Sequence, residues 1–110
     1  MKQNLQRTID YIEENLKTEL NAMELADMSG YSVFHFYRLF QNACGMPVMQ
    51  YILRRRLLHA IWEMNGKDTR IDIALQYGFE TYAGFYRAFQ RMFHMTPSEY
   101  LKKGMARKPY

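Results

Sequence analysis

The stretch Phe-Tyr-Arg-Leu-Phe-Gln at positions 36–41 returns as Phe-Tyr-Arg-Ala-Phe-Gln at positions 85–90, an offset of 49 residues. Ahead of each block stands a Gly followed by an aromatic residue, Gly30-Tyr31 and Gly78-Phe79, at an offset of 48. The second copy therefore carries one extra residue in its turn or at the start of its helix. The chain contains an internal repeat.

Each copy has the pattern of a helix-turn-helix, in which a short helix, a tight turn and a longer helix follow one another. A small residue inside the first helix, Ala26 or Ala74, permits close packing, and the Gly after it permits the turn. One such unit alone is equally typical of a generic helical hairpin packed for stability. Two units on a basic chain, with Arg38 and Arg87 at the same place in their second helices, favour the helix-turn-helix interpretation.

Start and stop signals for helices recur along the whole chain, and no segment alternates with period two. The expected starts and stops are, in chain order, the Asn21–Glu24 capping box, Gly30, the cap Ser32, Gly45, Pro47, the pair Asn65-Gly66, the cap Asp68 or Thr69, Gly78, a helix start at about Thr81 and the Thr96–Glu99 capping box with Pro97. They separate helices expected over about 5–16, 22–29, 32–44, 47–64, 70–77, 81–93 and 97–101.

These signals predict an all-α fold of about seven helices. Two helix-turn-helix subdomains are joined by a long linker helix in a tandem, homeodomain-like arrangement. The expected subdivision is a first subdomain over 1–46, a linker helix over 47–66, a second subdomain over 67–104 and a frayed tail over 105–110.

Composition narrows the class of protein. The chain has 110 residues, 48% of them hydrophobic, which suits one compact domain with a real core. Its formal net charge of +4 favours polyanionic partners such as nucleic acid or an acidic membrane surface. The single cysteine, Cys44, cannot form an internal disulfide. With no signal peptide and no apolar run of ~20 residues, a cytoplasmic protein is expected.

The second copy carries the most specific pattern. Its residues are Ile73-Ala74, Tyr77-Gly78-Phe79, then Phe85, Arg87 and Phe89, and finally Pro97-Ser98-Glu99-Tyr100. On these residues, and from about Leu5 to Leu101, the chain resembles the DNA-binding domain of the AraC/XylS family of bacterial transcription regulators. The chain departs from the family pattern at the stretch His94-Met95-Thr96, at Gly84 in the second recognition helix and at Leu101, where the family often has Arg.

The resemblance implies sequence-specific binding of double-stranded promoter or operator DNA, with recognition helices over about 32–44 and 81–93 in successive major grooves. Two such helices should sit one DNA turn apart, ~34 Å. The connecting helix of ~18 residues spans roughly 27 Å, which is the right order. The resemblance also implies contacts with RNA polymerase, to which acids such as Asp10, Glu13 and Glu14 can contribute.

In the first recognition helix, an apolar stripe of Val33, Phe36, Leu39 and Phe40 is expected to face the core. The candidate DNA-binding residues here are Ser32, Phe34, His35, Tyr37, Arg38 and Gln41. By resemblance Phe34, Tyr37 and Arg38 enter the major groove, where Arg38 can bond guanine O6 and N7 and the two aromatic rings can contact a thymine methyl. Two alternatives stay open, a solvated or phosphate-bound Arg38 and a Phe34 packed into the turn.

In the second recognition helix, Phe85, Phe89 and Phe93 form the expected buried row, and the candidate DNA-binding residues are Thr81, Tyr82, Ala83, Gly84, Tyr86 and Arg87. Ala83 and Gly84 have no hydrogen-bonding side chain, so this helix is expected to read fewer bases. Arg87 has a structural alternative, an ion pair with Glu80. The run 54–56 of three Arg is best interpreted as a solvated helix face with one internal ion pair, from which one or two side chains can reach phosphate.

Other functions have less support. No catalytic signature and no Gly-rich phosphate loop occurs, and His35, His59 and His94 lack a His or Cys partner at ligand spacing, so neither an enzyme nor a metal or cofactor site is expected. Cys44 is expected to pack rather than react. A helical protein-interaction module and a non-specific DNA-binding domain remain alternatives, while an interfacial membrane helix fits poorly. A small-molecule effector would act only through a further domain.

Overall fold

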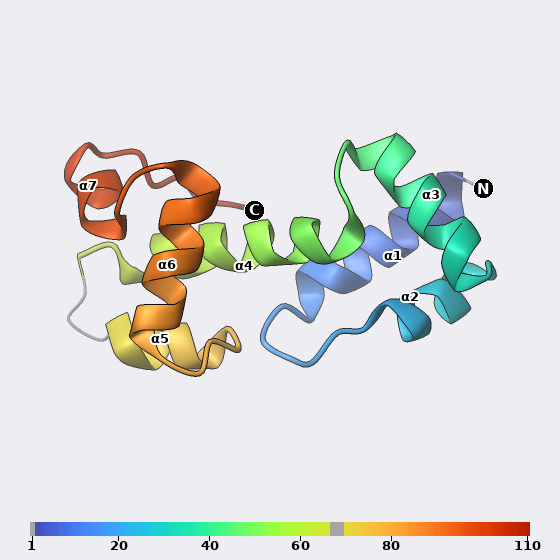
Figure 1. Cartoon of the computed structure of the whole chain (residues 1–110), viewed down its shortest axis with the longest axis horizontal. Helices are drawn as coiled ribbons and strands as arrows, with labels where there is room; N and C mark the ends of the chain where they lie inside the picture. Colours follow the sequence, from blue (N-terminus) through green and yellow to red (C-terminus); the bar gives the residue numbers. More distant parts are fainter. Residues whose placement is uncertain (1, 67–69) are drawn as a thin grey trace. The chain divides into compact units, whose positions relative to one another are not determined.

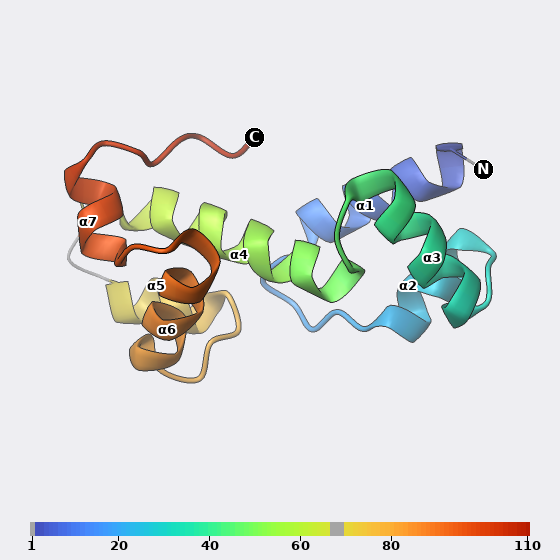
Figure 2. The ribbon, with the colours of Figure 1, turned by 45° about the horizontal axis from the view of Figure 1, so that its top comes forward.

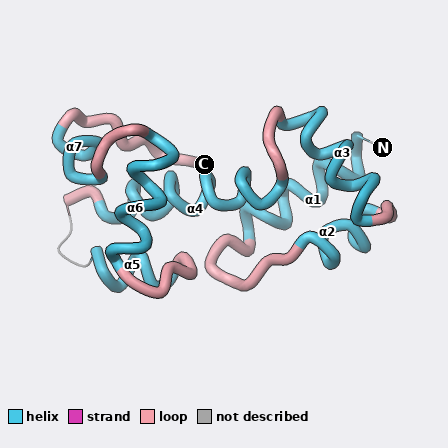
Figure 3. Tube along the Cα trace, viewed as in Figure 1, coloured by secondary structure: helices cyan, strands magenta, loops and turns pink. Residues whose placement is uncertain are grey.

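The computed structural model describes residues 2–66 and 70–110, and in these ranges it contains helices and no strand (Figures 1 and 3). The helices are α1 (Lys2–Glu14), α2 (Ala22–Ser29), α3 (Val33–Cys44), α4 (Val48–Met64), α5 (Arg70–Gln76), α6 (Tyr82–Phe93) and α7 (Pro97–Lys102). The expected all-α fold is confirmed.

The chain forms two compact units, Met1–Leu53 and Arg54–Tyr110. The boundary lies inside α4 because the two ends of this helix bury different side chains. Val48 and Ile52 are fully buried in the first unit, whereas Leu57, Ala60, Ile61 and Met64 are buried in the second. In the sequence analysis the whole stretch 47–66 is instead a separate linker.

In the first unit, α2 packs against both α1 and α3. Its core is made of side chains that recur at helical spacing, which are Ile12, Leu16, Leu20, Leu25, Ala26, Phe36, Phe40, Val48 and Ile52. One polar pair lies within it, where the hydroxyls of Thr8 on α1 and Ser29 on α2 are 2.7 Å apart. Ser29 also donates to the carbonyl of Leu25, so a polar group that burial would otherwise penalise is satisfied.

In the second unit the core is richer in aromatic rings. Phe85 and Phe89 are fully buried, and Phe89 lies 4.8 Å from Phe93 and 5.1 Å from Tyr100 between ring centroids. Burying one such ring contributes ~1.5–3 kcal/mol of transfer free energy. This cluster ties α6 to α7.

The two turns have the same backbone hydrogen bonds. Gly30 has φ 79° and Gly78 has φ 89°, the left-handed region that side chains with a Cβ rarely adopt. The next residue in each turn donates its N–H to the buried Ala, from Tyr31 to Ala26 at 3.2 Å and from Phe79 to Ala74 at 3.1 Å. The repeat seen in the sequence is therefore a repeat of backbone structure, with the pattern of a Schellman motif.

The helix starts follow the expected caps. Ser32 and Thr81 accept hydrogen bonds from the backbone N–H groups of His35 and Gly84, and Thr96 and Glu99 form the complete capping box. At Asn21 the side chain accepts from the N–H of Glu24, which is one half of the expected box. The expected cap at Asp68 or Thr69 lies outside the described residues.

The C-terminal tail differs from the expected frayed segment. Ala106 is only 8% exposed, and the Arg55 guanidinium donates to the carbonyl of Pro109 at 2.6 Å. The ring of Tyr110 stacks on His59, with centroids 5.8 Å apart. Residues after Gly104 thus lie against the second-unit part of α4 (Figure 2), because a cation and an aromatic ring on that helix hold them.

Candidate nucleic-acid interface

The side chains that α3 buries in the core determine which of its side chains point to solvent. Phe36 and Phe40 are fully buried, and Val33 and Leu39 are half-buried, so the expected apolar stripe faces the core. Ser32 caps the start of the helix, and Gly45, with φ 78°, ends it. The remaining positions must point to solvent.

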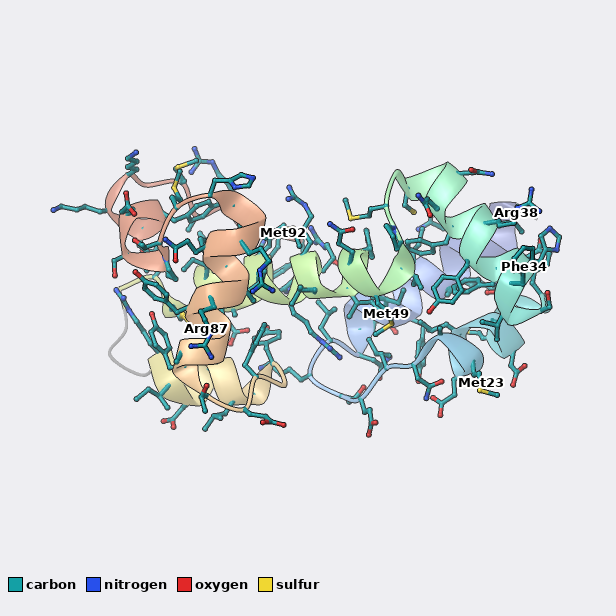
Figure 4. All side chains as sticks on the ribbon, in the orientation of Figure 1. Met23, Phe34, Arg38, Met49, Arg87 and Met92 are labelled. Carbon is teal, nitrogen blue, oxygen red and sulfur yellow. The ribbon has the colours of Figure 1, made fainter. Side chains whose placement is uncertain are left out.

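All six residues expected to bind DNA in the first unit are exposed, namely Ser32, Phe34, His35, Tyr37, Arg38 and Gln41. Phe34 keeps 73% of its surface exposed, so it does not pack into the turn as the alternative interpretation required. The Phe34 ring therefore has no role in the core and is open to contact with a partner. Figure 4 shows Phe34 and Arg38 projecting from α3.

Two ring contacts order this outer face. The guanidinium of Arg38 lies over the Phe34 ring, 5.7 Å from its centroid, at the distance of a cation–π contact. The ring of His35 meets Tyr31 edge to face at 4.9 Å, which holds it toward the turn. The face of α3 therefore presents a flat apolar ring and a planar five-donor cation side by side.

The outer face of α6 is smaller. Ala83 and Arg87 are exposed, Thr81 is an exposed N-cap, and Tyr82, Gly84 and Tyr86 are half-buried. Tyr82 packs its ring against Phe85 at 5.6 Å and Tyr86 at 6.5 Å. The two tyrosines thus belong partly to the packing of the unit, and the expected buried row of Phe85, Phe89 and the half-buried Phe93 lies beneath them.

Gly84 lies close to the N-cap of its own helix. A Cβ built on it would lie 3.3 Å from the Thr81 hydroxyl oxygen, which already accepts the Gly84 N–H at 2.9 Å. A side chain here would press on the cap.

The three consecutive arginines at positions 54–56 are less exposed than the sequence predicts. Arg54, Arg55 and Arg56 are half-buried rather than solvated. Arg54 lies over the Phe93 ring at 5.0 Å, Arg55 holds Pro109, and burial lowers the pKa of Arg56. The amphipathic period of α4 does not reveal this, because the covering groups come from α6 and the tail.

Two arginines on α6 are exposed. The Arg87 side chain is exposed (Figure 4), and its structural alternative, an ion pair with an acid such as Glu80, stays a prediction. Arg91, one turn further along α6, is also an exposed cation. Its spacing of four residues from Arg87 is a signal that the sequence analysis did not use.

Burial raises the pKa of the Cys44 thiol, which disfavours the reactive thiolate.

The described helices include none that is both long enough and apolar enough to cross a bilayer.

Comparisons with known proteins agree with this geometry. A family model described as a helix-turn-helix domain matches residues 25–103. The HTH-type transcriptional regulator YbfP of Bacillus subtilis is 42% identical over 97 residues, covering 87% of this chain and 33% of its own length. The regulatory protein SoxS of Salmonella typhimurium is 36% identical over 100 residues, covering 90% of this chain and 94% of its own.

Among solved structures, a transcriptional regulator from Chromobacterium violaceum, described among AraC-type DNA-binding domain-containing proteins, superposes with a TM-score of 0.83. Its sequence is 24% identical, and the match covers 93% of this chain and 92% of that one. This chain spans about a third of the length of YbfP and nearly all of SoxS. A likeness this complete extends to both helix-turn-helix units.

Proposed function

The chain belongs to the AraC/XylS family of helix-turn-helix transcription regulators, and from this premise we propose that it binds double-stranded operator DNA sequence-specifically through α3 and α6. The observation that carries the proposal is the outer face of α3. Phe34 and Arg38 stand there in contact with each other and otherwise exposed, with no role in the core.

The chemistry of these side chains suits base readout in the major groove. An Arg can bond the O6 and N7 of guanine bidentately, and an aromatic ring can contact the C5-methyl group of thymine. Backbone N–H groups at the start of a helix are donors for phosphate, which fixes register without reading sequence. Recognition helices entering successive major grooves would produce a site of two blocks one DNA turn, about 10 base pairs, apart.

We propose RNA polymerase as a second partner, on the basis of family membership and of the exposed acids Asp10 and Glu14 on α1. A helical protein-interaction module remains the alternative function. The difference between the two is whether the outer face of α3 meets bases or a protein.

Selection from a random duplex library with the full chain, at two salt concentrations, tests the function. Enrichment of a motif is expected, and the double variant Phe34→Ala/Arg38→Ala should lose it while keeping its helical circular dichroism. Salt-sensitive binding without a motif would reduce the activity to general DNA affinity. No binding at either salt concentration would favour the interaction module.

A further inference from the structure

The recognition helices α3 and α6 have matching caps, buried rings and exposed arginines, but their outer side chains differ. At an offset of 49 residues, the N-caps Ser32 and Thr81 correspond, as do the buried rings of Phe36 and Phe85. The exposed cations correspond too, as Arg38 and Arg87. The outer residues Phe34 and His35, by contrast, are matched by the two smallest side chains, Ala83 and Gly84.

This difference changes the environment of the matched arginines. Arg38 lies over the ring of Phe34, which stands one helical turn before it and limits the orientations of the guanidinium. Arg87 has Ala83 at that place, and a methyl group offers no ring to hold the cation. An oriented guanidinium suits bidentate recognition of one base, whereas a free one suits a phosphate that can be approached from many directions.

Formal charge is divided just as unequally between the two units. Met1–Leu53 contains four Lys and Arg against six Asp and Glu, a net −2, whereas Arg54–Tyr110 contains eleven against five, a net +6. The exposed cations in the described part of the second unit are Arg87, Arg91, Lys102, Lys103, Arg107 and Lys108. Because affinity for the DNA backbone grows with the number of phosphates neutralised, the second unit holds most of the capacity for it.

We propose that the two units divide the work on DNA, with the first unit reading base pairs through Phe34 and Arg38 and the second unit supplying mainly phosphate contacts. This inference rests on the proposed function and makes it more specific. Phosphate contacts fix position and carry no sequence information. The operator should therefore contain one information-rich block, under α3, and one poorly specified block, under α6.

The test uses the full chain and a fluorescent duplex carrying the sequence enriched by the library selection. Each base pair is replaced in turn by its transversion, and Kd is measured by anisotropy. Substitutions in one block should weaken binding ~10–100-fold, and those in the other block by less than about threefold.

Arg38→Ala and Arg87→Ala form a matched pair, because both residues are exposed and neither supports the core. Arg38→Ala should abolish the preference at one position of the sensitive block. Arg87→Ala should weaken binding to every duplex alike and lower the slope of log K against log salt by about 1. Arg7→Ala, an exposed cation of the first unit, is the control and should leave that slope unchanged.

Two results would overturn the division of work while leaving the function intact. The first is two blocks of equal sensitivity, and the second is a relaxed base preference in Arg87→Ala. If the full chain enriches no motif at all, the proposed function fails and this inference fails with it.

Discussion

The guanidinium carbon of Arg38 lies 5.7 Å from the centroid of the Phe34 ring, four residues earlier on α3. Both side chains are exposed, and the ring keeps 73% of its surface open to solvent. A contact between two exposed groups adds little to folding, roughly 0.5–1 kcal/mol. It does favour conformers in which an apolar ring and a planar cation lie together before any ligand arrives.

Phe34→Leu keeps an apolar side chain and removes the ring. Because Arg38 lies over this ring, we expect the variant to lose part of the preference for the base that Arg38 is proposed to read, together with its own contact. The measurement is Kd for the selected duplex with guanine or 7-deazaguanine at that base, which removes the N7 acceptor. Phe34→Tyr is the control that retains the ring. An unchanged penalty for 7-deazaguanine in Phe34→Leu would show that the ring does not position Arg38.

Gly78→Val should lower the free energy of unfolding by about 1–2 kcal/mol or more, since φ 89° puts a Cβ close to the following carbonyl. Nothing lies within 4 Å of the added Cβ, so the cost is backbone strain and not a clash. Urea unfolding followed by circular dichroism measures it. Gly78→Asn should lose less, because Asn tolerates the left-handed region. Equal losses for Val and Asn would contradict the strain argument.

His94 ends α6 with φ 60°, in the place that Gly45 takes at the end of α3 with φ 78°. His94→Gly should therefore raise the thermal midpoint, with relief of up to about 1 kcal/mol. Gly45→His is the reciprocal variant and should lower it. Differential scanning calorimetry of the two variants measures both changes in the thermal midpoint. A fall in the midpoint of His94→Gly would mean that the imidazole makes a contact worth more than the strain.

Thr8→Val removes a buried hydroxyl from the 2.7 Å contact with Ser29 while keeping the volume. We expect a loss of about 0.5–1.5 kcal/mol, the typical net contribution of one hydrogen bond, because Ser29 keeps its hydrogen bond to the Leu25 carbonyl. Chemical unfolding of the single variants and of Thr8→Val/Ser29→Ala forms a double-mutant cycle. The double variant should lose less than the sum of the two singles. If the losses of unfolding free energy in the two single variants simply add, the two hydroxyls do not stabilise each other.

The Glu99 carboxylate accepts the backbone N–H and faces the hydroxyl of Thr96, and these hydrogen bonds hold its pKa below the ordinary value. A lowered folded-state pKa gives stability that is present above the unfolded value, about 4.3, and is lost as pH falls through the folded pKa. Glu99→Gln, which keeps an acceptor for the capping box, should remove this part of the acid sensitivity. The readout is the difference between the two stability–pH curves below about pH 5. Parallel curves would contradict it.

Local signals were enough to predict most of the fold. Ser32 and Thr96 cap helices where the sequence places them, because an N-cap depends only on residues within one turn. The outward positions of α3 and α6 likewise follow from helical period once the buried aromatic rows are recognised. Fold class and the exposure of the candidate site are therefore within reach of sequence reasoning.

Contacts between segments that are distant in the sequence could not be predicted from it. Arg55 and His59 lie on what periodicity treats as a solvated part of α4, yet they hold Pro109 and Tyr110 some fifty residues later. The tail is expected to fray because it follows Gly104 at the end of the sequence, and its residues do not identify their partners on α4. The pairing of Phe34 with Arg38 is different, since a spacing of four residues on a helix is a sufficient signal for it.

The sharing of α4 between two cores has a consequence for dissecting the protein into autonomous fragments. Val48 and Ile52 complete one core and Leu57, Ala60, Ile61 and Met64 the other, on a single uninterrupted helix. Proteolysis or truncation between the exposed residues Asn65 and Gly66 would leave the downstream piece without its share of the helix and expose apolar side chains on the upstream piece. A fragment meant to retain either reading helix must be cut within α4 itself, near residues 53–54, where each product keeps its own buried turns.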